Sequence, residues 1–272
     1  MYIHDSHVHT EFSHDTTKKG PAGFDLTVRT AIEQGLSEIS ICDHCDIDDI
    51  LDGIYPEFPA EEIKAAVLAA RETYGDRIRI NFGVELGQPH VRPEEARALI
   101  EKCGFDFVVG SLHNLRLCPD FRFFRYDLMG QPQLDYIVKR VASESREIVE
   151  TGLVSSLAHL DYIHVKIESC GASIDMNRYA DDFAELFRAM IRNGVALEVN
   201  TSSLKSRGFT YPSAEFCALY RDLGGKRIVF GSDAHTANGV GQGIEEAATS
   251  MRALGFKSQT VIRDGKPTEI EL

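Results

Sequence analysis

The 272-residue sequence contains no long apolar run and no low-complexity tract. A helix that crosses a membrane needs about 20 consecutive apolar residues, and long disordered segments are poor in apolar residues. Here hydrophobic residues make up 43% of the chain and charged residues 26%. We therefore predict a soluble, folded globular protein, with neither a membrane-spanning segment nor extensive disorder.

Cysteine is sparse, and the pattern of an export signal is missing. The six cysteines are scattered along the chain and do not form a dense framework, as is typical of free thiols in a reducing compartment. The chain does not open with a basic segment followed by a short apolar stretch, the pattern that directs secretion. We expect no structural disulfides and a cytoplasmic location.

Positive charge is also scarce. The chain has 29 Lys and Arg residues against 42 Asp and Glu residues, which gives a formal net charge of -13. Nucleic-acid-binding proteins usually carry a basic patch, often with interleaved aromatic residues. The composition argues against nucleic acid as a partner, and an anionic substrate needs a local source of positive charge. The oligomeric state stays open.

Short β-branched runs alternate with longer helical patterns along the whole chain. The predicted strands are 2–8, 37–42, 78–85, 105–112, 153–159, 195–200 and 227–232, and the predicted helices are 26–35, 59–75, 92–104, 133–152, 177–194, 212–225 and 243–255. Several helices end at glycines suited to a left-handed cap, Gly75 among them. Repeated strand–helix units predict parallel strands in an open sheet or a closed barrel. Since no linker divides the chain, we predict one domain over residues 1–272.

Residue types that bind metals stand at the C-terminal ends of six of the seven predicted strands. They are His7, His9, His44, Glu85, His113, His159, Asp233 and His235. In a closed barrel these strand ends converge on one face, where such enzymes place their chemistry. One His-x-His pair means little, because alternate residues of any strand share a face. The repetition at six strand ends predicts a metal site, since a buried imidazole cluster needs coordination or neutralisation.

Four other histidines do not share this position, and we expect them to be exposed or locally hydrogen-bonded. They are His4, His14, His90 and His164, of which His14 and His164 also fit the mouth of the site. Cys42 and Cys45 form a CxxC motif around His44, but no second CxxC completes a structural zinc site. We interpret both cysteines as neighbours of His44.

Glycines 239, 241 and 243 follow the last predicted strand and precede a helix. In barrels this position often binds phosphate through backbone N–H groups, and a plain connection is an equally good interpretation. A dinucleotide-binding fold is disfavoured, because these glycines do not follow the first strand of a βαβ unit.

With these residues assembled, the sequence resembles the polymerase and histidinol phosphatase (PHP) family, especially its histidinol-phosphate phosphatase branch. The similar segments are DSHVHTEFSHD, ICDHCD, GVELG, GSLHN, LAHLD and FGSDAH, together with EVNTSSLKS at 198–206 and YPS at 211–213. The resemblance implies a single-domain distorted (βα)7 TIM-like barrel, the PHP fold, with its metal site at the C-terminal ends of the strands.

The resemblance also implies two or three divalent transition-metal ions, Zn, Mn or Fe. The implied ligands of three ions are, in turn, His7, His9, Glu85 and Asp233; Glu85, His113 and His159; and Asp15, His44 and His235. Mixed imidazole and carboxylate ligands suit these metals better than calcium. Three divalent ions outweigh the charge of three carboxylates, so an acidic protein gains a positive site for a phosphate ester.

The implied reaction is hydrolysis of L-histidinol phosphate to L-histidinol and phosphate, in histidine biosynthesis, by hydroxide bound to the metals. The candidate catalytic residues are Glu85, Asp233 and Asp161, and the candidate phosphate-binding residues are Lys205, Arg207 and Arg116. Lys205 is preferred because it matches a basic position in the branch. The segment HNLRLCPDFRFFRYD at 113–127 departs from the branch's pattern and would overhang the pocket. The substrate therefore stays open between L-histidinol phosphate and another small metabolite or nucleotide phosphate.

Two other classes of function fit less well. Metal-dependent amidohydrolases share the His-x-His pair, the barrel and a late aspartate, but they usually add a metal-bridging lysine at a strand end. None of the predicted strand ends carries a lysine there. A protein that only binds its ligand would be expected to have lost metal ligands, whereas all nine implied positions carry suitable residues.

Overall fold

The computed structural model describes residues 2–16, 22–263 and 265–272. The strands are β1 (His4–Val8), β2 (Glu38–Ile41), β3 (His44–Asp46), β4 (Arg79–Gly87), β5 (Phe107–Ser111), β6 (Ser156–Leu157), β7 (Ala196–Asn200), β8 (Ile228–Gly231), β9 (Ser258–Arg263) and β10 (Lys266–Glu271). The α-helices are α1 (Phe24–Glu33), α2 (Ile47–Leu51), α3 (Ala60–Tyr74), α4 (Pro93–Cys103), α5 (Gln131–Glu150), α6 (Tyr162–Ser169), α7 (Ala180–Asn193), α8 (Leu204–Arg207), α9 (Ala214–Asp222) and α10 (Ile244–Leu254). Short 3-10 turns include η1 (Phe121–Phe123) and η2 (Tyr126–Leu128).

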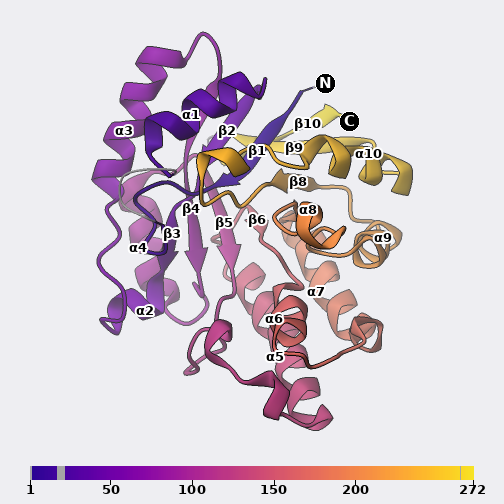
Figure 1. Ribbon diagram of the computed structural model, residues 1–272. Helices are drawn as coiled ribbons and strands as arrows, with labels where there is room; N and C mark the ends of the chain where they lie inside the picture. The colour runs from indigo at the N-terminus through magenta and orange to yellow at the C-terminus, as the bar shows by residue number, and fades with distance from the viewer. Residues whose placement is uncertain (1, 17–21, 264) are drawn as a thin grey trace.

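The main sheet is parallel and nearly closes on itself. Its order is β1-β2-β4-β5-β6-β7-β8, and β3 continues the second predicted strand and pairs with β4. Val8 forms a parallel bridge with Ala234, and the His9 N–H donates to the Ala234 carbonyl at 2.9 Å. The chain after the last strand therefore returns to the first, and helices surround the curved sheet (Figure 1). The predicted distorted (βα)7 barrel is confirmed.

The predicted helices correspond to α1, α3, α4, α5, α7, α9 and α10, with small shifts at the ends. Helix α5 shows why the pattern was readable, because its buried Leu134, Val138, Val141 and Ile148 recur at helical spacing. Gly104 and Gly194 end α4 and α7 in the left-handed conformation, as predicted. At Gly75 that prediction is wrong, because the residue ends α3 with φ -66° and keeps the right-handed conformation.

The strands enclose both polar and apolar buried side chains: His4, Ser40 and Asn81 form a hydrogen-bonded group, and an apolar cluster lies beside them. The apolar cluster consists of Cys42, Phe107, Val109, Ala158, Ala196, Val229 and Ile262. Ile262 belongs to the antiparallel hairpin of β9 and β10, which was not predicted. Arg263 of this hairpin forms an ion pair with Glu38, at the start of β2, at 2.6 Å. The hairpin thus covers the N-terminal end of the barrel, and the C-terminal strand ends lie at the opposite end.

Two predictions drawn from composition agree with the structure. All six cysteines are free thiols. Among the described residues, no helix combines the length and the apolar character needed to cross a membrane.

Candidate metal centre

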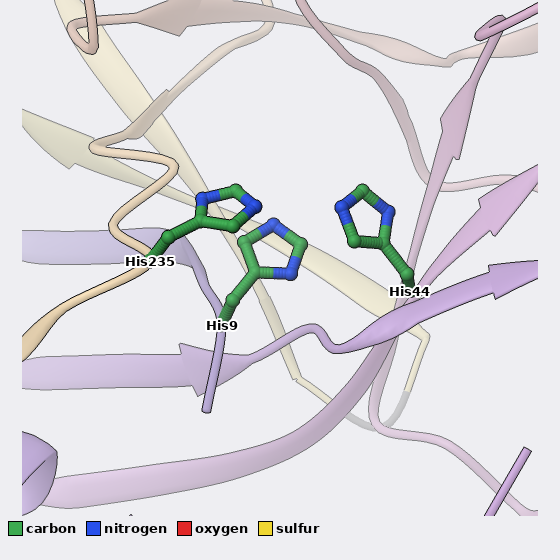
Figure 2. A group of neighbouring side chains, drawn as sticks. All are labelled: His9, His44 and His235. Carbon is green, nitrogen blue, oxygen red and sulfur yellow. The ribbon is translucent and has the colours of Figure 1, made fainter. Parts of the chain in front are cut away.

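Three histidines from distant parts of the chain meet at the C-terminal end of the barrel. His9 follows β1, His44 begins β3 and His235 follows β8, and their rings gather around one space (Figure 2). The His9 ring centroid lies 4.1 Å from that of His235 and 4.4 Å from that of His44. Each offers a nitrogen within 4.8 Å of those of the other two, so the three are placed to share an ion.

Glu85, in β4, lies at the centre of the remaining imidazoles and is fully buried. Its Oε1 is 3.0 Å from Nε2 of His159 and 3.1 Å from Nε2 of His113. Its Oε2 is 2.7 Å from Nδ1 of His44 and 3.5 Å from Nε2 of His7. One carboxylate therefore contacts side chains from several strands, which is the position expected for a ligand that bridges ions.

Two aspartates complete the cluster. Asp15 Oδ2 is 3.0 Å from His235 Nε2 and 3.4 Å from His44 Nε2. Asp233 Oδ1 is 3.1 Å from His9 Nε2. The structure thus brings all nine predicted ligand positions together, and their role as ligands stays a prediction.

The close groups differ in part from the implied ligand sets. Within the described part of the chain, three groups have ligand atoms within 4.8 Å of one another: His9, His44 and His235; His7, His9 and Glu85; and His44, Glu85 and His113. The second matches most of the first implied set. In the group with His44 and His235, His9 takes the place that the implied set gives to Asp15. In the group with Glu85 and His113, His44 takes the place of His159. Asp15 and His159 lie beside these groups.

Buried atoms without partners show that the cluster suits a metal. Glu85 Oε2 and His44 Nδ1 are 2.7 Å apart, yet neither atom has a hydrogen-bond partner among the described residues. Buried polar atoms are normally satisfied, so unpaired ligand atoms that face one another indicate a missing partner. Imidazole and carboxylate donors together are typical ligands of zinc and related transition metals.

The electrostatics of the cluster are strongly coupled. Burial lowers the pKa of His44, but Glu85, Asp15 and Asp46 together outweigh this effect and raise that pKa to about 10. Burial and the neighbouring His235 hold the pKa of His9 well below its ordinary value. Although burial raises the pKa of the Glu85 carboxyl, His44 and His113 bring it well below the ordinary value. The Glu85 carboxylate is therefore kept charged among imidazoles, as a metal ligand must be.

Several residues that orient the histidines were missed from the sequence. Glu198 Oε1 lies 2.7 Å from His7 Nδ1, Asp46 Oδ1 lies 2.6 Å from His113 Nδ1, and Ser13 Oγ lies 2.9 Å from His9 Nδ1. Such partners fix the ring orientation and leave the other nitrogen for a metal. The sequence did contain an indication for Glu198. It is a carboxylate inside the apolar run at 195–200, and a buried carboxylate needs a partner.

We expect Asp46→Asn to weaken metal binding by about 10- to 100-fold, the usual effect of removing such an orienting partner. Although burial opposes ionisation, His113 lowers the pKa of Asp46 to about 2, so a charged acceptor is lost in this variant. Competition with a chromogenic chelator would measure the change. Asp76→Asn, at an exposed turn, is the control. Equal affinities for the two variants would contradict the orienting role.

A cavity opens above the cluster. Besides the predicted ligands Asp15, His44, His113, His159, Asp233 and His235, it is lined by His14, Asp46, Asp120, Arg122 and Tyr162. Among the described residues, the three predicted phosphate-binding cations are absent from this lining. Arg116 pairs with Glu147 at 3.0 Å, Arg207 donates to Ser169 at 2.9 Å, and Lys205 is exposed on α8.

Asp161, a candidate for proton transfer, is also outside this lining. It is buried, and its Oδ2 accepts the Ser213 N–H at 2.9 Å. Burial raises its pKa to about 7.

Two residues of the cluster itself hold unusual backbone conformations, with φ 26° at His159 and φ 54° at Asp233. Positive φ at residues other than glycine is strained and is often found at functional sites.

The other histidines largely follow the prediction. His4 lies 2.9 Å from Ser40 Oγ, His90 lies 3.0 Å from Glu144, and His164 lies 3.2 Å from Glu168. These three are locally paired, whereas His14 lines the cavity.

Two of the three glycines after β8, Gly239 and Gly241, use their N–H groups within the chain. Gly241 N–H donates to Asp5 Oδ2 at 2.7 Å, and Gly239 N–H donates to the Thr236 carbonyl at 2.9 Å. Neither N–H is free for a phosphate, which favours the interpretation as a plain connection.

The chain is similar over nearly its whole length to proteins named histidinol-phosphatase. The chain is 26% identical over 262 residues to a probable histidinol-phosphatase of Thermotoga maritima, covering 96% of each chain. It is 25% identical over 256 residues to the histidinol-phosphatase of Lactococcus lactis, covering 93% of this chain and 91% of the relative. The crystal structure of the Lactococcus lactis histidinol phosphate phosphatase with zinc, L-histidinol and phosphate has a TM-score of 0.82 to this fold, at 23% identity, covering 98% of both chains.

The match to a known domain decides the family. Residues 5–202 match the PHP domain, and this range holds seven of the nine predicted ligand positions, from His7 to His159. Asp233 and His235 follow it and lie in the same cluster. The chain belongs to the PHP domain family.

Proposed function

We propose that this protein is a metal-dependent phosphomonoesterase that hydrolyses L-histidinol phosphate to L-histidinol and phosphate. The observation that carries the proposal is the buried cluster centred on Glu85, which lies at the catalytic face of a PHP barrel. Relatives of matching length are named histidinol-phosphatase, and one was crystallised with zinc, L-histidinol and phosphate.

The nine clustered residues would hold up to three ions. Zinc is supported by the related crystal structure, and manganese and iron suit the same donor types. Ions in such a site polarise a phosphoryl oxygen and lower the pKa of a water molecule towards about 7. Positive charge from the ions would offset the acidic character of the chain at this one place.

The chain's own residues position the reacting groups. Glu85 is fully buried and is not part of the cavity lining, so we assign it to bridging the ligand groups and not to contact with the substrate. The Asp233 side chain is 18% exposed and lines the cavity, and its Oδ2 accepts a hydrogen bond from Asn200 Nδ2 at 3.3 Å. Asp233 is therefore our candidate to orient the attacking water and to take up its proton, whereas Asp161 does not line the cavity.

The test is metal analysis of the purified protein followed by phosphate release from a panel of esters. The panel contains L-histidinol phosphate, nucleoside monophosphates and sugar phosphates. We expect the highest kcat/KM with L-histidinol phosphate. If fully metal-loaded protein released no phosphate from any ester, the phosphatase proposal would be wrong. A preference for a nucleotide would keep the chemistry and replace the substrate.

A further inference from the structure

The loop after β5 places two opposite charges at the mouth of the metal-site cavity. Asp120 and Arg122 both line that cavity. Asp120 Oδ1 accepts the Arg122 backbone N–H at 2.7 Å, and Asp120 Oδ2 lies 3.4 Å from Arg122 Nε. The Arg122 side chain is 40% exposed and that of Asp120 is 17% exposed. A partly exposed pair at this distance is weak, so a ligand with charges of its own can replace it.

Asp120 differs from the other carboxylates of the cavity lining. Asp15, Asp46 and Asp233 are each held by an imidazole of the cluster, at 3.0, 2.6 and 3.1 Å respectively. Asp120 has no such partner among the described residues, and its carboxylate contacts Arg122 of the same turn. It is therefore the lining carboxylate that stays available for a cation from the substrate.

Arg122 is held over the cavity by a second loop. Its Nη2 donates to the Tyr55 hydroxyl at 2.6 Å, and the Tyr55 ring stacks on His14 at a centroid distance of 3.8 Å. His14 in turn lies beside His44 of the metal cluster, with ring centroids 5.0 Å apart. The guanidinium thus has a defined position between the cluster and solvent, where a phosphate group bound at the cluster can reach it.

We propose that Asp120 and Arg122 select phosphate esters in which the carbon adjacent to the ester CH2 group carries an ammonium group. Arg122 binds the phosphoryl group, and Asp120 binds the ammonium group, each replacing its weak partner in the pair. The inference rests on the proposed function, because L-histidinol phosphate is such a β-amino alcohol ester. It goes further by excluding sugar phosphates and nucleotides, which have no ammonium group at that position.

The test compares two esters with the metal-loaded enzyme: L-histidinol phosphate and the imidazolylpropyl phosphate that lacks the amino group. We expect wild type to prefer the amino ester. Asp120→Asn should lower the ratio of the two kcat/KM values by about 10- to 100-fold, the range for a lost hydrogen bond to a charged group. Asparagine still accepts the Arg122 N–H, so the turn is preserved. Arg122→Met should raise KM for both esters by about tenfold.

A matched control lies on the next turn of the same loop. Arg125 pairs with Asp127 at 2.6 Å, both residues are exposed, and neither lines the cavity. Asp127→Asn and Arg125→Met should therefore keep the wild-type ratio and the wild-type KM.

The outcomes separate this inference from the proposed function. If wild type hydrolyses neither ester, the proposed function fails and the inference falls with it. If wild type hydrolyses L-histidinol phosphate but shows no preference between the esters, the inference alone is overturned. The same holds if Asp120→Asn keeps the wild-type ratio, or if the variant loses both activities equally. An unchanged KM in Arg122→Met overturns the part assigned to Arg122.

Discussion

Replacing Glu85 by glutamine should reduce phosphate release from L-histidinol phosphate by more than about 1,000-fold. Loss of a residue that only orients a ligand costs about 10- to 100-fold, and Glu85 itself lies between the ligand groups. Its two oxygens approach nitrogens of His159 and His44 at 3.0 and 2.7 Å. Glutamine keeps the shape but removes the charge, so the cluster loses the carboxylate that joins its parts.

Steady-state kinetics and metal content, both measured on the purified variant, would check this result. Glu72→Gln is the control, because Glu72 is an exposed glutamate of α3 and does not line the cavity. Circular dichroism should show an unchanged fold for both variants. Near wild-type turnover in Glu85→Gln would rule out a bridged cluster as the catalytic centre.

Removal of the bound metal should abolish activity and lower the melting temperature. After dialysis against a chelator, we expect activity to fall to background and the melting temperature to fall by several degrees. A ligand that binds only the folded state stabilises it by RT ln(1 + [L]/Kd), so loss of a tightly bound ion is visible in Tm. The unpaired buried atoms of Glu85 and His44 would then have neither metal nor hydrogen-bond partner.

Addition of zinc to the stripped protein should restore both activity and melting temperature. Differential scanning fluorimetry and a phosphate assay on the same samples would follow the two changes together. Dialysis against the chelator already saturated with zinc is the control, because it holds the buffer constant. Full activity in protein shown by elemental analysis to be metal-free would contradict the proposed mechanism.

Much of the fold was readable from local patterns. Helix α5 was predicted because apolar residues such as Leu134, Val138 and Val141 return every three or four positions. The hairpin of β9 and β10 was missed because β10 is largely exposed and polar, so its burial pattern gives little periodic signal. Gly75 was misassigned because a glycine permits the left-handed conformation without requiring it.

The candidate metal residues were predictable because they stand at the ends of predicted strands. His44 follows the predicted strand 37–42, Glu85 ends the predicted strand 78–85, and parallel strands of a barrel all bring their C-terminal ends to one face. Residues that support the histidines were harder to find. Asp46 and Glu198 also lie in strands, but their partners His113 and His7 are distant in sequence, so only the folded arrangement shows which imidazole each one holds.

Local sequence thus determined the seven barrel strands, the long helices and the residue types at the strand ends, because side-chain periodicity is a property of neighbouring residues. The tertiary structure decided which charged side chains reach the cavity. Arg116 and Arg122 belong to the same loop, and of the two only Arg116 was a candidate from the sequence. In the fold, Arg116 turns to Glu147 of α5, while the turn capped by Asp120 directs Arg122 to Tyr55 above the cluster. The path of a loop depends on contacts with distant elements, and no local pattern encodes them.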